Sequence, residues 1–412
     1  MRLTTWAWRN LIRNRRRTAI TVFSVAFGVL LAVTFTASAD YSYTSMINTS
    51  ANMGLGHLSV QHPAYQDAPN PEHRLADAEA IHRAVLGLAG VSAARTRIMG
   101  QAVFASGAKS TGGSFVAIDP DQEDPAHNLF LRSMVSGHVF TEADGHGVVV
   151  GERMAERLGL RLGKKLVFTT TDKNGELVSE MARVSGIFRT GDEAADSGLA
   201  LLPIGLVRQA LSYEPGAASL VAVFLDDHRQ AESIRNKLAA RLPHDTARVL
   251  TWQESQADLA GLIAVDRLFN YLLQMLVGLV IAAGIMNTLL MSVMERRREF
   301  GIMLALGMGP GQLARLVLLE SCWIGIAGLA AGTLLSTPWF LYMQQVGIDL
   351  SRYIGTDYSA GGVLVDPVLR FVLHAESMTG IATVALGLTV CAALFPAFRA
   401  GRTPPLGSLR QE

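Results

Sequence analysis

The sequence is poor in charged residues and in cysteine. Of its 412 residues 17% are charged and half are hydrophobic, whereas ordinary soluble domains carry about 25% charged residues. The formal net charge is +1 and no basic domain stands out, which argues against a nucleic-acid partner. Both cysteines, Cys322 and Cys391, lie in apolar stretches, so we expect packing residues rather than a disulfide or a metal site. This composition indicates membrane segments combined with soluble material.

The sequence also lacks recognisable catalytic motifs. The stretch from Gly159 to Lys165 resembles a phosphate-binding loop but has one residue too few between its glycines and no Ser or Thr after the lysines. The stretch from Gly307 to Gly311 does not fit a dinucleotide-binding motif, because no strand precedes it. Both are expected to be turns. The histidines show no metal-ligand spacing and no nucleophile elbow occurs. We therefore expect no catalytic residue, no metal site and no cofactor bound by this chain.

Four apolar segments are long enough to cross a bilayer, which takes about 20 residues. We predict membrane helices at residues 17–39, 267–294, 312–345 and 377–398. The first segment also resembles a signal peptide, because it has a basic start and ends in Ala37-Ser38-Ala39. Its apolar run is longer than the roughly 7–15 residues of a signal-peptide core, so we interpret it as a helix that is kept.

Arginines near these segments predict the orientation. They lie before the first span, between the second and third, and after the fourth: Arg2, Arg9, Arg13, Arg15, Arg16, Arg17; Arg296, Arg297, Arg298, Arg315; and Arg399, Arg402, Arg410. Since basic residues remain on the cytoplasmic side, both termini are expected there. This gives a cytoplasmic N-terminal segment (1–16), a cytoplasmic loop (295–311) and a cytoplasmic tail (399–412), with an external domain (40–266) and an external loop (346–376). Arginines and apolar residues lie on opposite faces of a helix over 1–16, which predicts an interfacial helix; alternatively, the arginines are only a positive flank that sets the topology.

The external segment alternates between strand and helix patterns. Strands are expected at residues 57–62, 148–150, 166–170, 182–188, 221–225 and 248–252, and helices at 152–160 and 230–242. We expect the last strand–helix–strand unit to pair with the opening strand, and a β-rich insertion to lie between them. The predicted fold class is an α-helical membrane protein with four transmembrane helices and a large α+β extracytoplasmic domain between the first two.

The cytoplasmic segment after the second span combines charge with apolar residues. Its apolar side chains are unusual for a solvated loop unless something covers them, which indicates a docking helix. The residues assigned to this docking interface are Arg298, Glu299, Phe300, Gly301, Met303, Leu304, Ala305, Leu306 and Gly307. Alternatively, the charges merely stop the second span and hold its topology.

Glu320 is an acid at the start of the third apolar segment. An acidic residue inside a membrane helix is costly and indicates a function. If the helix begins deeper in the cytoplasm, Glu320 instead lies at the headgroups. Arg315 and the arginine cluster at 296–298 are its candidate partners.

Four groups of residues carry a family resemblance. They are Ala7 to Leu11 with Arg16 to Thr18; Val149 to Gly151, Ala155 to Leu160, Gly163 and Val184 to Phe188; Glu295, Arg296, Glu299, Gly301, Ala305 and Gly307; and Pro396 to Ala400 with Pro405, Leu409 and Arg410. In this order they resemble the FtsX-like permease family of ABC transporters, which includes MacB-type exporters and lipoprotein-release permeases. The chain departs from the family pattern at Leu304, where an arginine is common, and in its longer external loop.

The resemblance implies an inner-membrane permease subunit that acts with a second permease subunit and a dimer of a separate cytoplasmic ATPase. ATP and Mg would then be bound by the ATPase. The predicted function is extraction of lipoprotein or other lipid-anchored cargo, with a periplasmic carrier or the lipoprotein cargo as a further partner; efflux of a peptide or drug and signalling to a cell-wall hydrolase remain alternatives. Cargo lipid chains are expected to contact the outer halves of the first two spans, at Val29, Val33, Phe35, Phe269, Leu272 and Leu273.

Overall fold

The computed structural model describes residues 3–13, 15–143, 145–243, 245–354, 359–360 and 363–402. The predicted tail residues Pro405, Leu409 and Arg410, as well as Arg2, lie outside this part of the chain. Contacts divide the chain into two compact units. The helical unit comprises residues 1–41, 265–349 and 368–412, and the sheet unit comprises residues 42–264 and 350–367.

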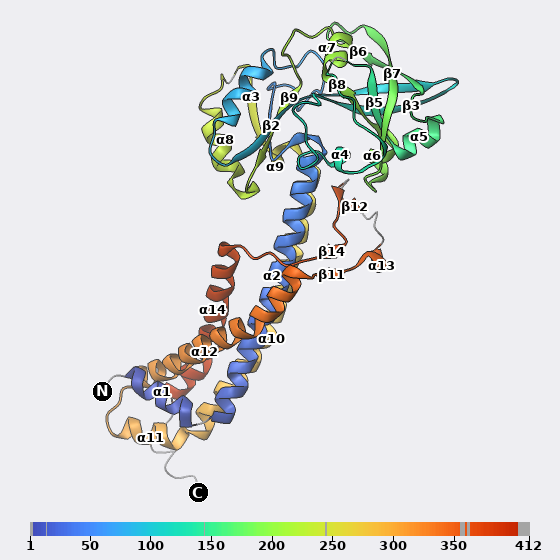
Figure 1. Ribbon diagram of the computed structural model, residues 1–412. Coiled ribbons are helices and arrows are strands. Elements are labelled where there is room, and N and C mark those ends of the chain that lie inside the picture. The colour runs from blue at the N-terminus through green and yellow to red at the C-terminus, as the bar shows by residue number, and fades with distance from the viewer. Residues whose placement is uncertain are drawn as a thin grey trace. The chain divides into compact units, whose positions relative to one another are not determined.

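The helices of the helical unit follow the apolar segments but extend past them. They are α1 (Leu3–Arg13), α2 (Arg15–Ser50), α10 (Ala257–Glu295), α11 (Arg297–Ala305), α12 (Pro310–Gln345) and α14 (Ala375–Gly401) (Figure 1). Strands β11 (Ile348–Asp349) and β14 (Val368–Leu369) pair beyond the end of α12. Within the described residues, α2, α10, α12 and α14 are long and apolar enough to cross a membrane.

Glycines let α2 and α12 approach closely. A Cβ atom at Gly328 would lie 2.5 Å from Cβ of Val25, and one at Gly332 would lie 2.6 Å from Cβ of Val29. These distances are far below van der Waals contact, so a larger residue at either position would force the helices apart. Such small residues are typical of helix interfaces in membranes, where close backbone packing replaces the hydrophobic effect.

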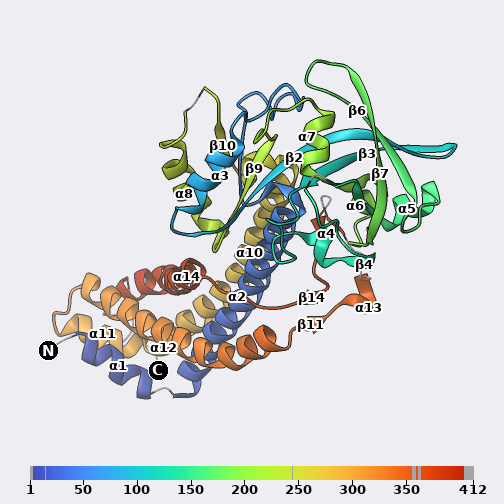
Figure 2. The same cartoon turned by 45° about the horizontal axis from the view of Figure 1, so that its top comes forward.

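The sheet unit contains one ten-stranded sheet with short helices around it (Figure 2). Its strands are β1 (Leu58–Gln61), β2 (Val91–Ser106), β3 (Lys109–Ile118), β4 (Met134–Gly137), β5 (Gly147–Gly151), β6 (Lys165–Thr171), β7 (Leu177–Phe188), β8 (Leu199–Pro203), β9 (Leu220–Leu225) and β10 (Arg248–Thr251). The helices are η1 (Ala51–Leu55), α3 (Ala78–Leu86), α4 (Leu129–Arg132), α5 (Glu152–Leu158), α6 (Glu193–Gly198), α7 (Ile204–Ala210), η2 (His228–Gln230), α8 (Ala231–Ala239) and α9 (Trp252–Ser255). The short α13 (Ser351–Ile354), β12 (Ser359–Ala360) and β13 (Val363–Leu364) lie in the segment that the sequence analysis expects to be an external loop. All eight strands and helices predicted from the sequence for this unit are present.

Six strands of this sheet close into a ring. The second half of β2 pairs with β3 on one side and with β6 on the other, and the ring continues through β8, β5 and β7. Buried and exposed side chains alternate along β6, as expected of a sheet wrapped around a core. Phe104 and Phe168 are fully buried, and the Phe115 ring lies 6.5 Å from that of Phe168. The ring lies between β1 and β9 in the chain, where the sequence analysis expects a β-rich insertion.

The other strands form the part of the sheet next to the ends of the long helices. The first half of β2 pairs with β9, β9 with β1, and β1 with β10, all antiparallel. Strand β1, in the opening portion of this unit, thus lies between the two strands of the last strand–helix–strand unit. Strand β1 follows α2 through η1, and β10 leads through α9 into α10. The two helices that leave the sheet unit are thus continuous with two neighbouring strands.

Candidate functional site

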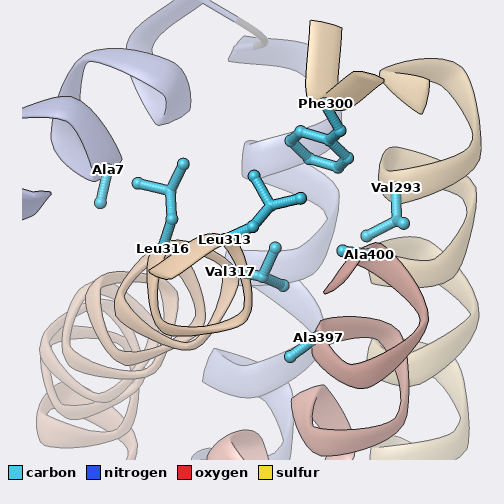
Figure 3. Close-up of a cluster of buried hydrophobic side chains, with 8 residues drawn as sticks. All are labelled: Ala7, Val293, Phe300, Leu313, Leu316, Val317, Ala397 and Ala400. Carbon is cyan, nitrogen blue, oxygen red and sulfur yellow. The ribbon is translucent and has the colours of Figure 1, made fainter. Parts of the chain in front are cut away.

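Helix α11 is the charged and apolar segment that the sequence marks as a docking site. Its inner face is anchored by Phe300, whose side chain is 1% exposed. Phe300 belongs to a buried cluster with Val293 of α10, Leu313, Leu316 and Val317 of α12, Ala397 and Ala400 of α14, and Ala7 of α1 (Figure 3). Gly301 is buried beside it. Phe300 and Gly301 therefore do not lie at a surface that a partner could contact, which corrects the assignment of these two residues.

The outer face of α11 carries the remaining predicted docking residues. Arg298, Ala305, Leu306 and Gly307 are exposed, and the Leu306 side chain is 83% accessible. Met303 and Leu304 are half-buried against the Phe300 cluster. Ile302, which the sequence analysis did not select, is 46% exposed. Ile302 lies four residues after position 298 and three and four residues before positions 305 and 306, so these four positions share one side of the helix and its C-terminal end. This side of α11 presents an apolar surface edged by one arginine.

Glu320 of α12 is buried and paired. Its carboxylate accepts a hydrogen bond from Nη1 of Arg296 at 3.1 Å and another from Nδ2 of Asn10 at 2.8 Å. The side chains of Arg296 and Glu320 are 6% and 8% exposed. A buried carboxylate is tolerated when it is paired and hydrogen-bonded in this way. Arg296 comes from the arginine cluster proposed as a partner, whereas Arg315 is exposed.

Glu299 joins α11 to two arginines. It accepts hydrogen bonds from Nη2 of Arg13 at 2.7 Å and from Nε of Arg296 at 2.9 Å. Partial burial acts to raise the pKa of Glu299, but the hydrogen bonds and charges of Arg296 and Arg13 outweigh it and lower that pKa. Glu299 is therefore ionised at neutral pH and available to both arginines.

The residues predicted to contact cargo separate into two groups. Val29 and Val33 are 3% and 8% exposed, and Val29 packs against Gly332 of α12. Their assignment as ligand-contacting residues is corrected, since both side chains are buried within the chain. Phe35 is half-buried, and Phe269, Leu272 and Leu273 of α10 are 66%, 49% and 46% exposed. These four residues remain accessible.

The junction between α2 and the sheet contains residues that the sequence analysis missed. Arg97 of β2 is 1% exposed and forms a two-pronged ion pair with Glu123, at 2.7 and 2.8 Å. Its Nη1 donates to the carbonyl oxygen of Gly54 at 2.8 Å. Gly54 lies in η1 with a φ of 148°, a conformation that non-glycine residues rarely adopt. Arg97 thus fixes the point at which the long helix turns into the sheet.

The start of α10 is tied to the same junction. The Ser50 hydroxyl at the end of α2 donates to the side-chain oxygen of Gln256, just before α10. Thr251 and Glu254 form a capping box at the start of α9, which fixes the entry of the chain into this segment.

Among the described residues no group of three or more His, Cys, Asp and Glu side chains could hold a metal ion.

In the described part of the chain, four membrane-length helices, a large sheet unit inserted between the first two of them and a short helix between the second and third are typical of a membrane protein with one large soluble domain. Comparison with known proteins identifies its family. The sequence model of one protein family, the MacB-like periplasmic core domain, matches residues 18–241. That of another, the FtsX-like permease C-terminal, matches residues 271–405. The chain belongs to the FtsX-like, MacB-type family of ABC transporter permeases.

Individual relatives are distant but cover most of the chain. A protein named lipoprotein-releasing system transmembrane protein LolC from Neisseria meningitidis is 23% identical over 78% of this chain and 79% of its own length. LolE from Haemophilus influenzae is 24% identical over 70% of both chains. An uncharacterised ABC transporter permease of Methanocaldococcus jannaschii is 22% identical over 99% of this chain and 97% of its own.

Proposed function

We propose that this permease subunit converts ATP hydrolysis by a separate cytoplasmic ATPase into movement of its sheet unit, and so extracts lipoprotein or other lipid-anchored cargo from the inner membrane. Family membership implies a cytoplasmic ATPase partner. ATP and Mg would be bound there, and a second permease subunit, identical or related, would complete the assembly. The proposed orientation places both termini and α11 in the cytoplasm, because arginines concentrate there.

The observation that carries this proposal is the pairing of β1 with β10. Strand β1 follows α2, and β10 leads into α10. A relative displacement of the two helices would therefore act directly on one pair of hydrogen-bonded strands. Arg97 and the Ser50–Gln256 bond hold both helix ends at this place. Movement driven by an ATPase on one side of the membrane would then be transmitted through the two helices to a soluble domain on the other side, without a transport channel.

The docking surface for the ATPase is proposed to be the outer face of α11, formed by Arg298, Ile302, Ala305 and Leu306. Burying the Leu306 side chain would contribute about 1.5–3 kcal/mol. Replacing Leu306 with Asp should therefore weaken ATPase binding by roughly 10- to 150-fold, since each 1.4 kcal/mol is a factor of ten. Co-purification of the ATPase and its stimulated turnover measure this effect.

The matched control is Leu177→Asp. Leu177 is 78% exposed on β7 of the sheet unit, so the same substitution is made on an equally exposed leucine away from α11. Wild-type ATPase binding by Leu306→Asp, or an equal loss in the control, would show that the docking site lies elsewhere.

The cargo class rests on two observations. Relatives carry the name of lipoprotein-releasing system proteins, and α10 exposes Phe269, Leu272 and Leu273. Acyl chains gain about 0.8 kcal/mol for each CH₂ kept from water, and apolar walls of this kind suit them.

A photo-crosslinker at Phe269 should capture lipid-anchored cargo in a nucleotide-dependent manner. A crosslinker at Leu334 of α12, which is 79% exposed, serves as a control that should capture bulk lipid alone. Capture of bulk phospholipid at both sites, unchanged by nucleotide, would oppose extraction and favour efflux or signalling to a cell-wall hydrolase.

A further inference from the structure

Five side chains at one end of the helical unit form a closed polar ring. In α1, Asn10 donates to Glu320 at 2.8 Å and Arg13 donates to Glu299 at 2.7 Å. Arg296 bridges the two acids, with Nη1 at 3.1 Å from Glu320 and Nε at 2.9 Å from Glu299. Because Asn10 and Arg13 lie one turn apart on α1, the ring closes through that helix. It thereby joins α1, α11 and α12.

The ring is balanced in charge and graded in burial. Arg13 and Arg296 offset Glu299 and Glu320, and Asn10 is neutral. The Arg296–Glu320 side is nearly fully buried, whereas Arg13 and Glu299 are 55% and 42% exposed. An exposed ion pair contributes little, but breaking a buried one leaves an uncompensated charge. The linkage therefore depends mainly on Arg296 and Glu320.

Arg296 is suited to this position by its shape. A guanidinium group presents several N–H donors in a fixed fork, so it can hold two carboxylates at once, which an ammonium group does poorly. Its Nη2 atom is buried without a hydrogen-bond partner among the described residues. Arg296 also lines a small pocket together with Thr18, Thr21, Thr288 and Ser292. The pocket volume of about 20 Å³ is enough for one water molecule.

The ring reinforces an apolar contact between the same elements. Ala7 of α1 and Phe300 of α11 are members of one buried cluster with Leu316 of α12. The Trp8 and Trp323 rings lie 5.1 Å apart in an edge-on arrangement. The apolar contacts bring the three elements together, and the directional hydrogen bonds of the ring fix their relative rotation.

We propose that Arg296 and Glu320 are positioning residues that lock the docking helix α11 to α1 and α12, so that a displacement of α11 also moves the amphipathic helix α1. This inference rests on the proposed function in that α11 is the segment moved by the ATPase. It makes α1 a part of the transmission path rather than a passive topology signal.

The linkage is tested by the distance between α1 and α11 in the purified full chain without any ATPase. Spin labels are placed at Thr5 and Ile302, both exposed, after Cys322 and Cys391 are replaced by Ala. We expect a single narrow distance distribution in the otherwise native chain. Glu320→Gln should broaden the distribution, and Arg296→Lys should broaden it as well although the positive charge is kept.

Two further variants guard against misfolding and general loosening. Asn10→Ala removes the hydrogen bond from the uncharged Asn10 side chain to Glu320. The variant should remain folded and should broaden the distance distribution only mildly. Arg17→Gln removes the Arg17–Glu295 pair between α2 and α10, at 2.6 Å, and should leave the distribution unchanged because that pair lies outside the ring. Unchanged distances in Glu320→Gln and Asn10→Ala, or equal broadening in Arg17→Gln, would overturn the proposal.

A second readout separates linkage from mere stability. In the complex with the ATPase, Glu320→Gln should bind the ATPase with unchanged affinity but lose cargo-stimulated turnover by roughly 5- to 150-fold, the usual range of coupling between sites. Loss of binding together with turnover would oppose a positioning role. Since the distances are measured without the ATPase, their outcome is independent of whether α11 is the docking site.

Discussion

The buried ion pair at the end of α2 allows a sharp test of how the helix is joined to the sheet. Arg97 and Glu123 are each 1% exposed, and Arg97 also donates to the carbonyl oxygens of Gly54 and His127. Replacing Arg97 with Met keeps much of the volume but leaves the Glu123 charge buried and unpaired. Removing one partner of a buried ion pair costs about 3–5 kcal/mol, so Arg97→Met should open this junction locally.

The double variant Arg97→Met, Glu123→Leu gives the second half of the argument. Replacing both partners of a buried pair by apolar residues is often close to neutral. The carbonyl of Gly54 would still lose its donor, at roughly 1–3 kcal/mol. The double variant should therefore recover part, but not all, of the stability lost in Arg97→Met.

Amide hydrogen exchange of the full chain in detergent measures the local effect. Where exchange follows local opening, 3–5 kcal/mol corresponds to roughly 100- to 5,000-fold faster exchange in η1 and residues 119–128, since 1.4 kcal/mol is a factor of ten. Arg74→Met is the control, because Arg74 holds Glu214 with the same two-pronged geometry while these side chains are 21% and 47% exposed. That change should cost about 1 kcal/mol or less. If Arg97→Met exchanges no faster than Arg74→Met, burial of the pair is not what holds the junction.

Two other predictions concern packing and pH. Gly332→Val should lower the free energy of unfolding of the chain in detergent by about 1–3 kcal/mol, the usual cost of overpacking, because its Cβ would lie 2.6 Å from Cβ of Val29. Val29→Ala in the same chain should restore part of the loss. The melting temperature measures both effects, and an unaltered value in Gly332→Val would oppose the packing argument. Burial, followed by the nearby His228, lowers the pKa of His57 from 6.5 to about 4, and its Nδ1 atom accepts a hydrogen bond from the Leu225 amide, which requires the neutral ring. Between pH 4 and 6.5 the unfolded chain therefore binds more protons than the folded one, so the stability of the sheet unit should be full above pH 6.5 and decline toward pH 4. Hydrogen exchange across this pH range in wild type and in His57→Gln measures the decline. The same decline in the variant would exclude His57 as its source.

Local patterns predicted much of the fold because they depend on neighbouring residues. Hydropathy located the four long helices, and the alternation of polar and apolar residues at positions 57–62 located strand β1. The stretch from Gly159 to Lys165 was predicted to be a turn, and Gly159 ends α5 in the left-handed conformation with a φ of 63°. The length of α2 was not predicted, because residues 40–50 are polar and their helix is set by contacts within the sheet unit rather than by hydropathy.

Pairing between distant residues could not be predicted from the sequence. Periodicity indicated strands but not that β2 contacts β9 with its first half and β3 and β6 with its second. The Arg97–Glu123 pair joins positions that are 26 residues apart, and neither has a distinctive local motif. Glu320 was recognised as unusual, yet a single sequence could not decide which arginine lies next to it.

Phe300 shows a different limit. An apolar residue within a charged segment indicates that something covers it, but the pattern is the same whether the cover is another protein or the chain itself. In the structure α10, α12 and α14 supply it. The exposed Leu306, directly after the last residue of the same helix, is the residue for which the inference of an outside partner still holds.

The two faces of α11 also differ in how firmly they are expected to be held. Truncating a buried phenylalanine such as Phe300 to alanine typically costs about 3–5 kcal/mol, whereas burying Leu306 against a partner would contribute about 1.5–3 kcal/mol. The buried Arg296–Glu320 pair adds to the inner attachment. A partner that pulls on the outer face would therefore lose its own contact before it detached α11 from the bundle. Movement imposed on α11 must then pass to α12 and α1, and this order of strengths is what a transmitting helix requires.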